Sequence, residues 1–192
     1  IDNSGNWKAL HYKAKKAFKN TIISTSEKDK KINVSIINDT FSDITDTLKI
    51  AHLDFFGNII FEEKQVLTSP ANSSKILYNY SLEQLAFNRN NSFLKLVFGD
   101  IEYLHFFVRP KDLKLSKEEI LIEVAKNDSG FLVRLHSETL QKDVFLFSNN
   151  KGTWADNYFD LLPKEAKEIQ FFTNDNTAPK IHLKALNQFI QN

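Results

Sequence analysis

The sequence predicts an all-β protein, with two β-sandwiches in tandem after one short N-terminal helix. Beyond residue 18 the chain consists of short segments in which polar and apolar side chains alternate, as in half-buried strands. Turn residues separate these segments, and a proline-containing break at 109–112 divides them into two groups. Only the first eighteen residues have helical spacing.

Residues 1–18 are predicted to form a basic amphipathic helix. Its apolar positions are Trp7, Leu10, Ala14 and Phe18, which lie opposite several lysines. The helix is too short, and its apolar stripe too narrow, to bind a membrane strongly. We expect residues 1–18 to be frayed, or to dock onto the first sandwich or onto a neighbouring molecule.

Residues 19–110 are predicted to form the first sandwich. The alternating segments in this region are 31–36, 47–53, 59–61, 75–78, 93–98 and 103–108. Six or seven short strands in about 90 residues are typical of an immunoglobulin-like fold.

Residues 111–192 are predicted to form a second, smaller immunoglobulin-like sandwich. Its expected strands are 119–124, 131–136, 143–147, 167–172 and 181–186. Residues 127–130 have the composition of a hairpin turn, and 162–165 contain a proline suited to a tight corner.

Composition excludes several classes of protein. The net charge of +1 provides no strong field for nucleic acid or for an anionic membrane, and no apolar run approaches the roughly 20 residues of a membrane span. The absence of cysteine excludes a disulfide framework and thiol catalysis. Methionine is absent as well, including at position 1, so we expect an excised or processed part of a longer chain.

No set of residues in the sequence has the spacing of an active site or a metal site. The adjacent acids Glu62-Glu63 and Glu118-Glu119 point to opposite faces of a strand, so neither pair can act as an acid/base couple. The histidines are far apart, and four of them lie in strand-like runs; they are His11, His52, His105, His136 and His182. We therefore predict no catalytic residue, no metal site and no cofactor in this chain.

Trp154 has two interpretations. It follows a loop, residues 149–153, so it could be an exposed contact for a glycan or for a protein partner. It could equally cap the core of the second sandwich, because seventeen phenylalanines against two tryptophans favour core filling over sugar stacking.

The sharpest local pattern covers residues 154–169, where Asp-Asn-Tyr-Phe-Asp-Leu-Leu-Pro-Lys-Glu connects two strands through a corner. An Asp/Asn-Tyr pair there can form side-chain hydrogen bonds to the backbone. The pattern resembles the C-terminal immunoglobulin-like domain of β-mannosidases in glycoside hydrolase family 2. That family usually has Gly where this chain has Lys164, which puts the backbone conformation of the corner in question.

Residues 7–18 support the same resemblance. They begin Trp-Lys-Ala-Leu-His-Tyr and continue as a basic segment ending in Phe18, similar to the segment that leaves the catalytic (β/α)8 barrel in that family. The resemblance implies that residues 1–18 are a remnant of the end of the barrel. It also implies that the two catalytic glutamates, about 5–5.5 Å apart in retaining enzymes, lie on the barrel upstream. The family's Asn-Glu acid/base dipeptide does not occur here.

The resemblance makes Trp7 a candidate wall of the sugar pocket, in the intact enzyme only. The alternative is that Trp7 is a packing anchor at the start of a helix. Either way the fragment itself is expected to be inactive.

Two functions from different classes follow. The first is a non-catalytic C-terminal region of a retaining β-mannosidase that cleaves terminal β-D-mannosyl residues. Its partners would be the catalytic barrel of the same polypeptide and, through the parent enzyme, a mannose-containing glycan; a homodimer is left open. The second is an independent carbohydrate-binding or adhesion module of immunoglobulin-like type. The natural mannoside and the compartment are also left open, with a periplasmic or secreted location favoured over the cytoplasm.

Overall fold

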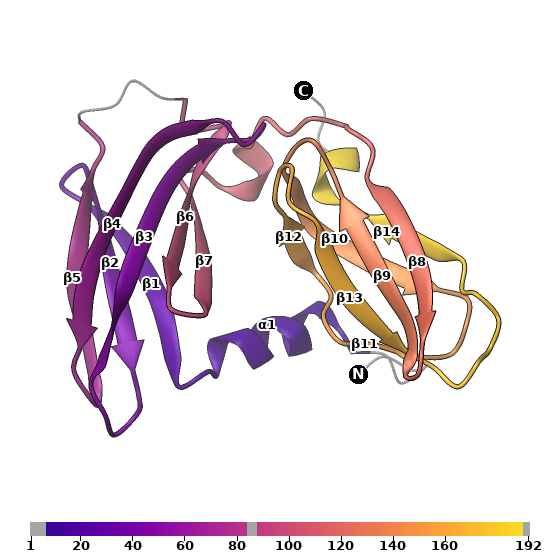
Figure 1. Cartoon of the computed structure of the whole chain (residues 1–192). Coiled ribbons are helices and arrows are strands. Elements are labelled where there is room, and N and C mark those ends of the chain that lie inside the picture. The colour runs from indigo at the N-terminus through magenta and orange to yellow at the C-terminus, as the bar shows by residue number, and fades with distance from the viewer. Residues whose placement is uncertain (1–6, 84–87, 190–192) are drawn as a thin grey trace. The chain divides into compact units, whose positions relative to one another are not determined.

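The computed structural model describes residues 7–83 and 88–189, and Figure 1 shows its elements along the chain. Helix α1 (Ala9–Ala17) is followed by the strands β1 to β14. One short 3-10 helix, Pro110–Asp112, lies between β7 and β8, and a second, Leu186–Gln188, follows β14. The predicted all-β class, with tandem sandwiches after an N-terminal helix, is confirmed. The first six residues of the predicted helix lie outside the described residues.

The chain divides into two compact units. One contains residues 17–54 and 58–113, and the other contains residues 1–16, 55–57 and 114–192. Among the described residues no helix is long and apolar enough to cross a membrane.

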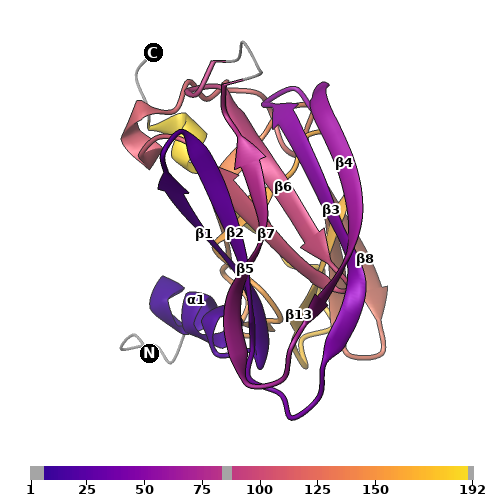
Figure 2. The same cartoon turned by 90° about the vertical axis from the view of Figure 1, so that its left-hand side faces the viewer.

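The first unit is a sandwich of two antiparallel sheets, seen most clearly in Figure 2. One sheet has the order β1-β2-β5 and the other β4-β3-β6-β7. The strands are β1 (Thr21–Lys28), β2 (Lys31–Asn38), β3 (Ile44–Asp54), β4 (Ile59–Ser69), β5 (Ser73–Ser81), β6 (Ser92–Phe98) and β7 (Ile101–Phe106).

Alternation places the core of this sandwich. In β2, the side chains of Ile32, Val34 and Ile36 are fully buried while the residues between them are partly exposed. They pack against apolar residues of the opposite sheet, such as Leu94 and Leu96 of β6. The burial of one face of each sheet explains why these strands were visible in the sequence.

Two strands of the first sandwich differ most from the sequence predictions. The predicted set did not include β1, in which Thr25 and Glu27 stand opposite Val34 and Ile32 of β2 and interrupt the apolar alternation. The segment predicted as 59–61 extends to Ser69. The prediction stopped early because β4 is an edge strand of its sheet and most of its side chains are exposed. A strand with little buried surface has no apolar alternation to detect.

The second unit is also a sandwich of two antiparallel sheets, with strand orders β11-β13-β9-β8 and β12-β10-β14. Its strands are β8 (Leu121–Asn127), β9 (Gly130–His136), β10 (Gln141–Ser148), β11 (Thr153–Trp154), β12 (Phe159–Leu161), β13 (Lys167–Phe172) and β14 (Ile181–Lys184). Inward residues of β9, β10 and β13, among them Val133, Val144 and Ile169, form its core.

Candidate functional site

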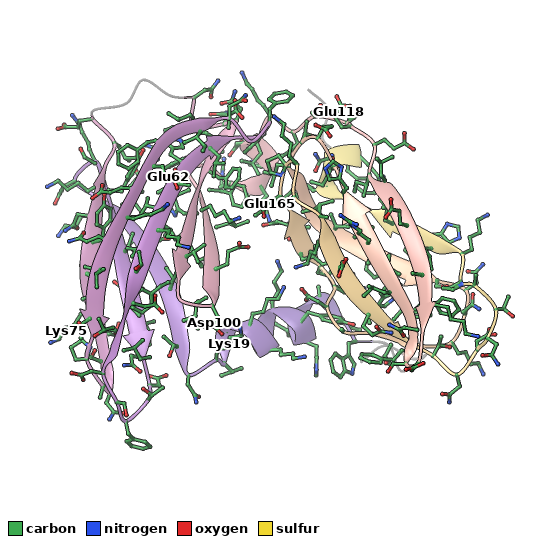
Figure 3. All side chains as sticks on the ribbon, in the orientation of Figure 1. Lys19, Glu62, Lys75, Asp100, Glu118 and Glu165 are labelled. Atoms are coloured by element: carbon green, nitrogen blue, oxygen red, sulfur yellow. The ribbon has the colours of Figure 1, made fainter. Side chains whose placement is uncertain are left out.

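The structure gathers no catalytic set from the titratable residues named above. His52, His105, His136 and His182 lie on four different strands, as predicted, and His11 lies on α1. Glu62 stands on β4 and Glu118 precedes β8 (Figure 3). Within the described ranges, no three His, Cys, Asp or Glu side chains are grouped so that they could hold a metal ion.

His52 is a core residue of the first sandwich. Its Nδ1 lies 2.8 Å from Tyr80 Oη, and its ring also packs against Phe107. Burial lowers the pKa of His52 to about 4, so the ring is neutral near pH 7. Its role is therefore to pair with Tyr80 inside the core.

Trp154 lies in β11 and is only 9% exposed. Its ring contacts Phe171 with the ring centroids 4.6 Å apart, within the core of the second sandwich. This position corresponds to the core interpretation of Trp154, because the buried ring offers no open face to a glycan.

The pattern at 154–169 forms the predicted strand, corner and strand, as β12 and β13. Asn157 is buried, and its side chain pairs with the backbone of Leu146 on β10. Its Oδ1 accepts a hydrogen bond from Leu146 N, and its Nδ2 donates one to Leu146 O, both at 2.8 Å. The amide thus continues the sheet as a short strand would.

Asp160 of β12 satisfies an irregularity in the same partner strand. The register between β10 and β12 shifts between Gln141 and Val144, and Asp143 there has a positive φ of 51°. Asp160 Oδ1 accepts hydrogen bonds from Asp143 N and from the buried Lys142 Nζ, both at 2.9 Å. Polar side chains of this pattern therefore replace strand hydrogen bonds at the bulge.

Lys142 is held as an ammonium ion. Burial opposes its charge, but the carboxylates of Asp160 and Asp143 outweigh this effect and raise the pKa of Lys142. Burial also opposes the charge of Asp143, yet Lys142 and Lys13 lower the pKa of that carboxyl. The sequence search missed this cluster, since only the bulge brings its members together.

The corner follows β12, and Glu165 is labelled there in Figure 3. Lys164 N donates to Ser137 O at 2.8 Å, and Lys164 has a φ of +62°. This is the left-handed conformation that glycine adopts without strain. The corner therefore has the backbone that a glycine suits, although a lysine occupies it.

Helix α1 is anchored on the second sandwich. Residues 1–18 were expected to be frayed, or to dock onto the first sandwich or a neighbouring molecule, but the described part of the helix packs on the second sandwich. Tyr12 is buried, its Oη lies 3.5 Å from Trp154 O, and its ring contacts Tyr158. Two ion pairs flank it, Lys13 with Asp143 at 3.1 Å and Lys16 with Asp156 at 2.9 Å.

The buried face of α1 is not the predicted apolar stripe. Leu10 is 78% exposed, and Phe18, just after the helix, is 86% exposed. Trp7, before the helix, contacts His11 and Tyr12, with ring centroids 4.0 and 5.6 Å away. Sequence reasoning chose the most apolar stripe and missed Tyr12, whose hydroxyl and ring both find partners on the sandwich.

Comparison with protein families assigns both sandwiches. Residues 30–112 match the mannosidase Ig/CBM-like domain, and residues 115–188 match the Ig-fold domain of the mannosidase type. A comparison with curated proteins gave no match.

Solved structures share the fold. A β-D-mannosidase from Dictyoglomus thermophilum is 24% identical with a TM-score of 0.78, over 96% of this chain and 24% of that one. The Amycolatopsis orientalis exo-chitosanase CsxA is 15% identical with a TM-score of 0.63, over 97% of this chain and 28% of that one. The chain thus spans about a quarter of each enzyme. The two family matches together cover most of the chain, which therefore belongs to the Ig-type domains of mannosidases and shares the fold of part of these solved enzymes.

Proposed function

We propose that this region braces the catalytic barrel of a retaining β-mannosidase in the same polypeptide. The barrel would hydrolyse terminal β-D-mannosyl residues of a mannose-containing glycan, and it would supply both catalytic glutamates. The division into residues 1–18, 19–110 and 111–192 is part of this proposal, with the first segment as the end of the barrel.

The observation that carries the proposal is the anchored helix. Tyr12, Lys13 and Lys16 attach α1 to the second sandwich with a buried ring and two ion pairs. The segment that resembles the exit from a barrel is therefore held on the accessory region in a defined orientation. A barrel that continued into this helix would be tied to the sandwich by it.

Exposed apolar side chains at the helix support the same proposal. Leu10 of α1 is exposed, and so is Phe18 just after the helix, whereas Tyr12 is buried against the sandwich. Large exposed apolar groups are typical of a surface that another part of a protein covers. In the proposed enzyme, the barrel covers them.

Trp7 could line the sugar pocket in this enzyme. Its ring is 38% exposed, and it is oriented by contacts with His11 and Tyr12. A ring supported on one side and open on the other could contact a bound sugar. A homodimer of the parent enzyme is compatible with this proposal.

The experiment compares three polypeptides: the region alone, the gene's upstream barrel alone, and both together. Hydrolysis of p-nitrophenyl β-D-mannoside is expected from the joined polypeptide and not from the region alone. In the joined enzyme, Leu10→Asp should lower the thermal midpoint of inactivation, because it places a charge against the barrel.

Val66→Asp is the matched control, since Val66 is an exposed apolar residue of β4. It should leave the midpoint unchanged. An upstream sequence without an Asn-Glu dipeptide on a barrel, or a barrel that is equally stable without this region, would contradict the proposal.

The alternative, an independent glycan-binding or adhesion module, relies mainly on an exposed Trp154. The burial of that ring removes its main support.

A further inference from the structure

A hollow lies at one end of the second sandwich, where three loops meet. Its volume is about 1030 Å³, and its walls come from the β8–β9 turn, the β10–β11 loop and the β13–β14 loop. Figure 1 shows β11, the end of β13 and the β8–β9 turn at the same end of the sandwich. Most of the lining residues have polar side chains, and Phe172 is the aromatic residue among them.

The loops that form this hollow are held by their own hydrogen bonds. Asn150 Nδ2 donates to Asp175 Oδ2 at 2.7 Å, which joins the β10–β11 loop to the β13–β14 loop. Thr173 Oγ1 donates to Lys151 O, also at 2.7 Å, and ties the same two loops together again. A hollow with bridged walls exists before any ligand arrives, so binding costs little ordering of the loops.

Gly152 keeps the two loops close. A Cβ at this position would lie 2.5 Å from Cζ of Phe171 and 2.6 Å from the carbonyl oxygen of Phe172, distances that real Cβ atoms do not reach. The absence of a side chain therefore lets the β10–β11 loop lie directly against β13.

Several polar side chains of the lining are uncommitted. Asp128, Asn149, Lys151 and Asn174 make no side-chain hydrogen bond or ion pair with another described residue. The amides both donate and accept, the carboxylate accepts, and the ammonium donates. Such a set suits hydroxyl groups, which also donate and accept.

Phe172 adds an apolar surface to this polar wall. The last two residues of β13 point to opposite faces, so Phe171 enters the core while Phe172 stays 45% exposed. In the sheet, Phe172 is flanked by Thr153 and Gly130, and Gly130 has no side chain to cover the ring. The ring is thus open toward solvent beside the uncommitted polar groups.

The charge of the lining disfavours an anionic ligand. It contains two carboxylates, Asp128 and Asp175, and one ammonium, Lys151. Hydrogen bonds from Thr177 N and Asn150 lower the pKa of Asp175, so this carboxyl is ionised at neutral pH. A phosphate or uronate would therefore meet net negative charge, whereas a neutral polyol would not.

We propose that this hollow binds a neutral oligosaccharide. The apolar face of one sugar ring lies on Phe172, and its hydroxyl groups bond to Asn149, Asn174 and Asp128. The site lies within the accessory region, so it goes beyond the proposed bracing function. Its test needs no catalytic barrel.

The experiment titrates the ¹⁵N-labelled 192-residue chain with β-1,4-mannohexaose, cellohexaose, chitohexaose and an anionic trigalacturonate. At least one neutral hexaose should shift the backbone resonances of 128–129, 149–153 and 172–175. The trigalacturonate should bind at least about tenfold more weakly, a difference of about 1.4 kcal/mol.

The variants separate binding at this hollow from binding elsewhere. Phe172→Ala should weaken binding about tenfold and Asn174→Ala about threefold, because they remove the platform and one hydrogen-bonding group. Phe189→Ala is the matched control, since Phe189 is 66% exposed on the same unit and does not line the hollow; it should bind normally. Tryptophan emission, to which Trp154 beside Phe171 contributes, checks that the variants are folded.

Three outcomes would overturn the proposal. They are no resonance shift with any neutral hexaose at about 10 mM, shifts that map outside the three loops, and unaltered binding by Phe172→Ala. A dissociation constant near 1 mM corresponds to a binding free energy of about −4 kcal/mol, and a site of that affinity is detectable at about 10 mM hexaose. None of these outcomes would change the hydrolysis expected from the joined enzyme, so failure here is distinct from failure of the bracing proposal.

Discussion

The two sandwiches satisfy the backbone hydrogen bonds of their sheets by different means. The first pairs long strands: β3 and β4 have 11 residues each and are in register along most of their length. The second contains strands of two, three and four residues, β11, β12 and β14. Short strands form few hydrogen bonds with neighbouring strands, so the backbone groups of the second sandwich need other hydrogen-bond partners.

Side chains provide those partners in the second sandwich. Three backbone N–H groups of β10 donate to side chains: Lys142 to Asn187, Asp143 to Asp160 and Leu146 to Asn157. The first sandwich has a comparable group at the end of β2, where Asn38 Nδ2 donates to the carbonyl oxygens of Ser42, Ser69 and Pro70. Where side chains supply the hydrogen bonds of a sheet, its stability depends on the identity of those residues. Where backbone groups of neighbouring strands pair with each other, the sheet requires mainly that polar and apolar side chains alternate.

Removing Trp154 should produce the largest effect, confined to the second sandwich. Trp154→Ala deletes a buried ring from a small core and should lower the free energy of unfolding by about 3–5 kcal/mol. Urea titration followed by NMR resonances of each sandwich measures the two losses separately. Phe41→Ala, at an almost fully exposed ring of the first unit, is the control. A loss below about 1 kcal/mol would remove Trp154 from the core.

Asn157 tests whether side chains replace strand pairing. Asn157→Ala leaves the N–H and C=O of Leu146 without these partners, at a cost of about 2–4 kcal/mol in the second sandwich. The same urea titration, now followed also by tryptophan emission, measures the loss. Asn79→Ala, at an exposed position of β5, should change stability by less than about 0.5 kcal/mol. Equal effects of the two substitutions would show that Asn157 is an ordinary surface amide.

The contrast between the sandwiches also explains what the sequence could predict. Alternation revealed β2, β3 and β6, because one face of each strand is buried. It could not reveal β1, which is rich in serine and threonine, or most of the exposed edge strand β4. The pattern at 154–169 was identified by its proline-containing corner and by the family resemblance, and its polar side chains prove to have structural partners.

Long-range contacts were beyond sequence reasoning. Helical spacing identified the helix, but it selected Leu10 and Phe18 as the packing face when the sandwich binds Tyr12. The loops around Phe172 are local and polar, and nothing in their sequence shows that three of them meet. The buried face of α1 and the hollow beside Phe172 both depend on residues that are distant in the sequence, and local patterns do not show which distant residues meet.

His52 should make the first sandwich sensitive to acid. Its pKa is about 4 when folded and about 6.5 when unfolded, so at intermediate pH the unfolded chain binds the extra proton. Stability is therefore present in full above about pH 6.5 and is lost as pH falls toward 4. The free energy of unfolding should be about 2 kcal/mol lower at pH 5 than at pH 7.5 from this residue.

Denaturant titrations of the first sandwich at the two pH values measure this loss. His52→Gln, which can still accept or donate toward Tyr80, should reduce the pH dependence. The described part of the second sandwich has no fully buried histidine and serves as the internal reference. An NMR titration that places the pKa of His52 near 6.5 would contradict the assignment.

The smallest expected effect is a gain, at the corner of the second sandwich. Lys164 has a φ of +62°, which costs a non-glycine residue about 1–2 kcal/mol, whereas glycine adopts it freely. Glycine also makes the unfolded chain more flexible, which offsets part of the gain. Lys164→Gly should therefore raise the free energy of unfolding by about 0.5–1 kcal/mol.

Lys164→Ala separates backbone strain from the loss of the lysine charge. It removes the ammonium but retains a Cβ in the left-handed conformation, so it should give no gain. Lys30 is the counterpart in the first sandwich, with a φ of 57° in the turn between β1 and β2, and Lys30→Gly should give a similar gain there. A gain with alanine as large as with glycine would assign the effect to charge. If glycine gives no gain in the free energy of unfolding at either position, the left-handed conformation of these two lysines does not destabilise either sandwich.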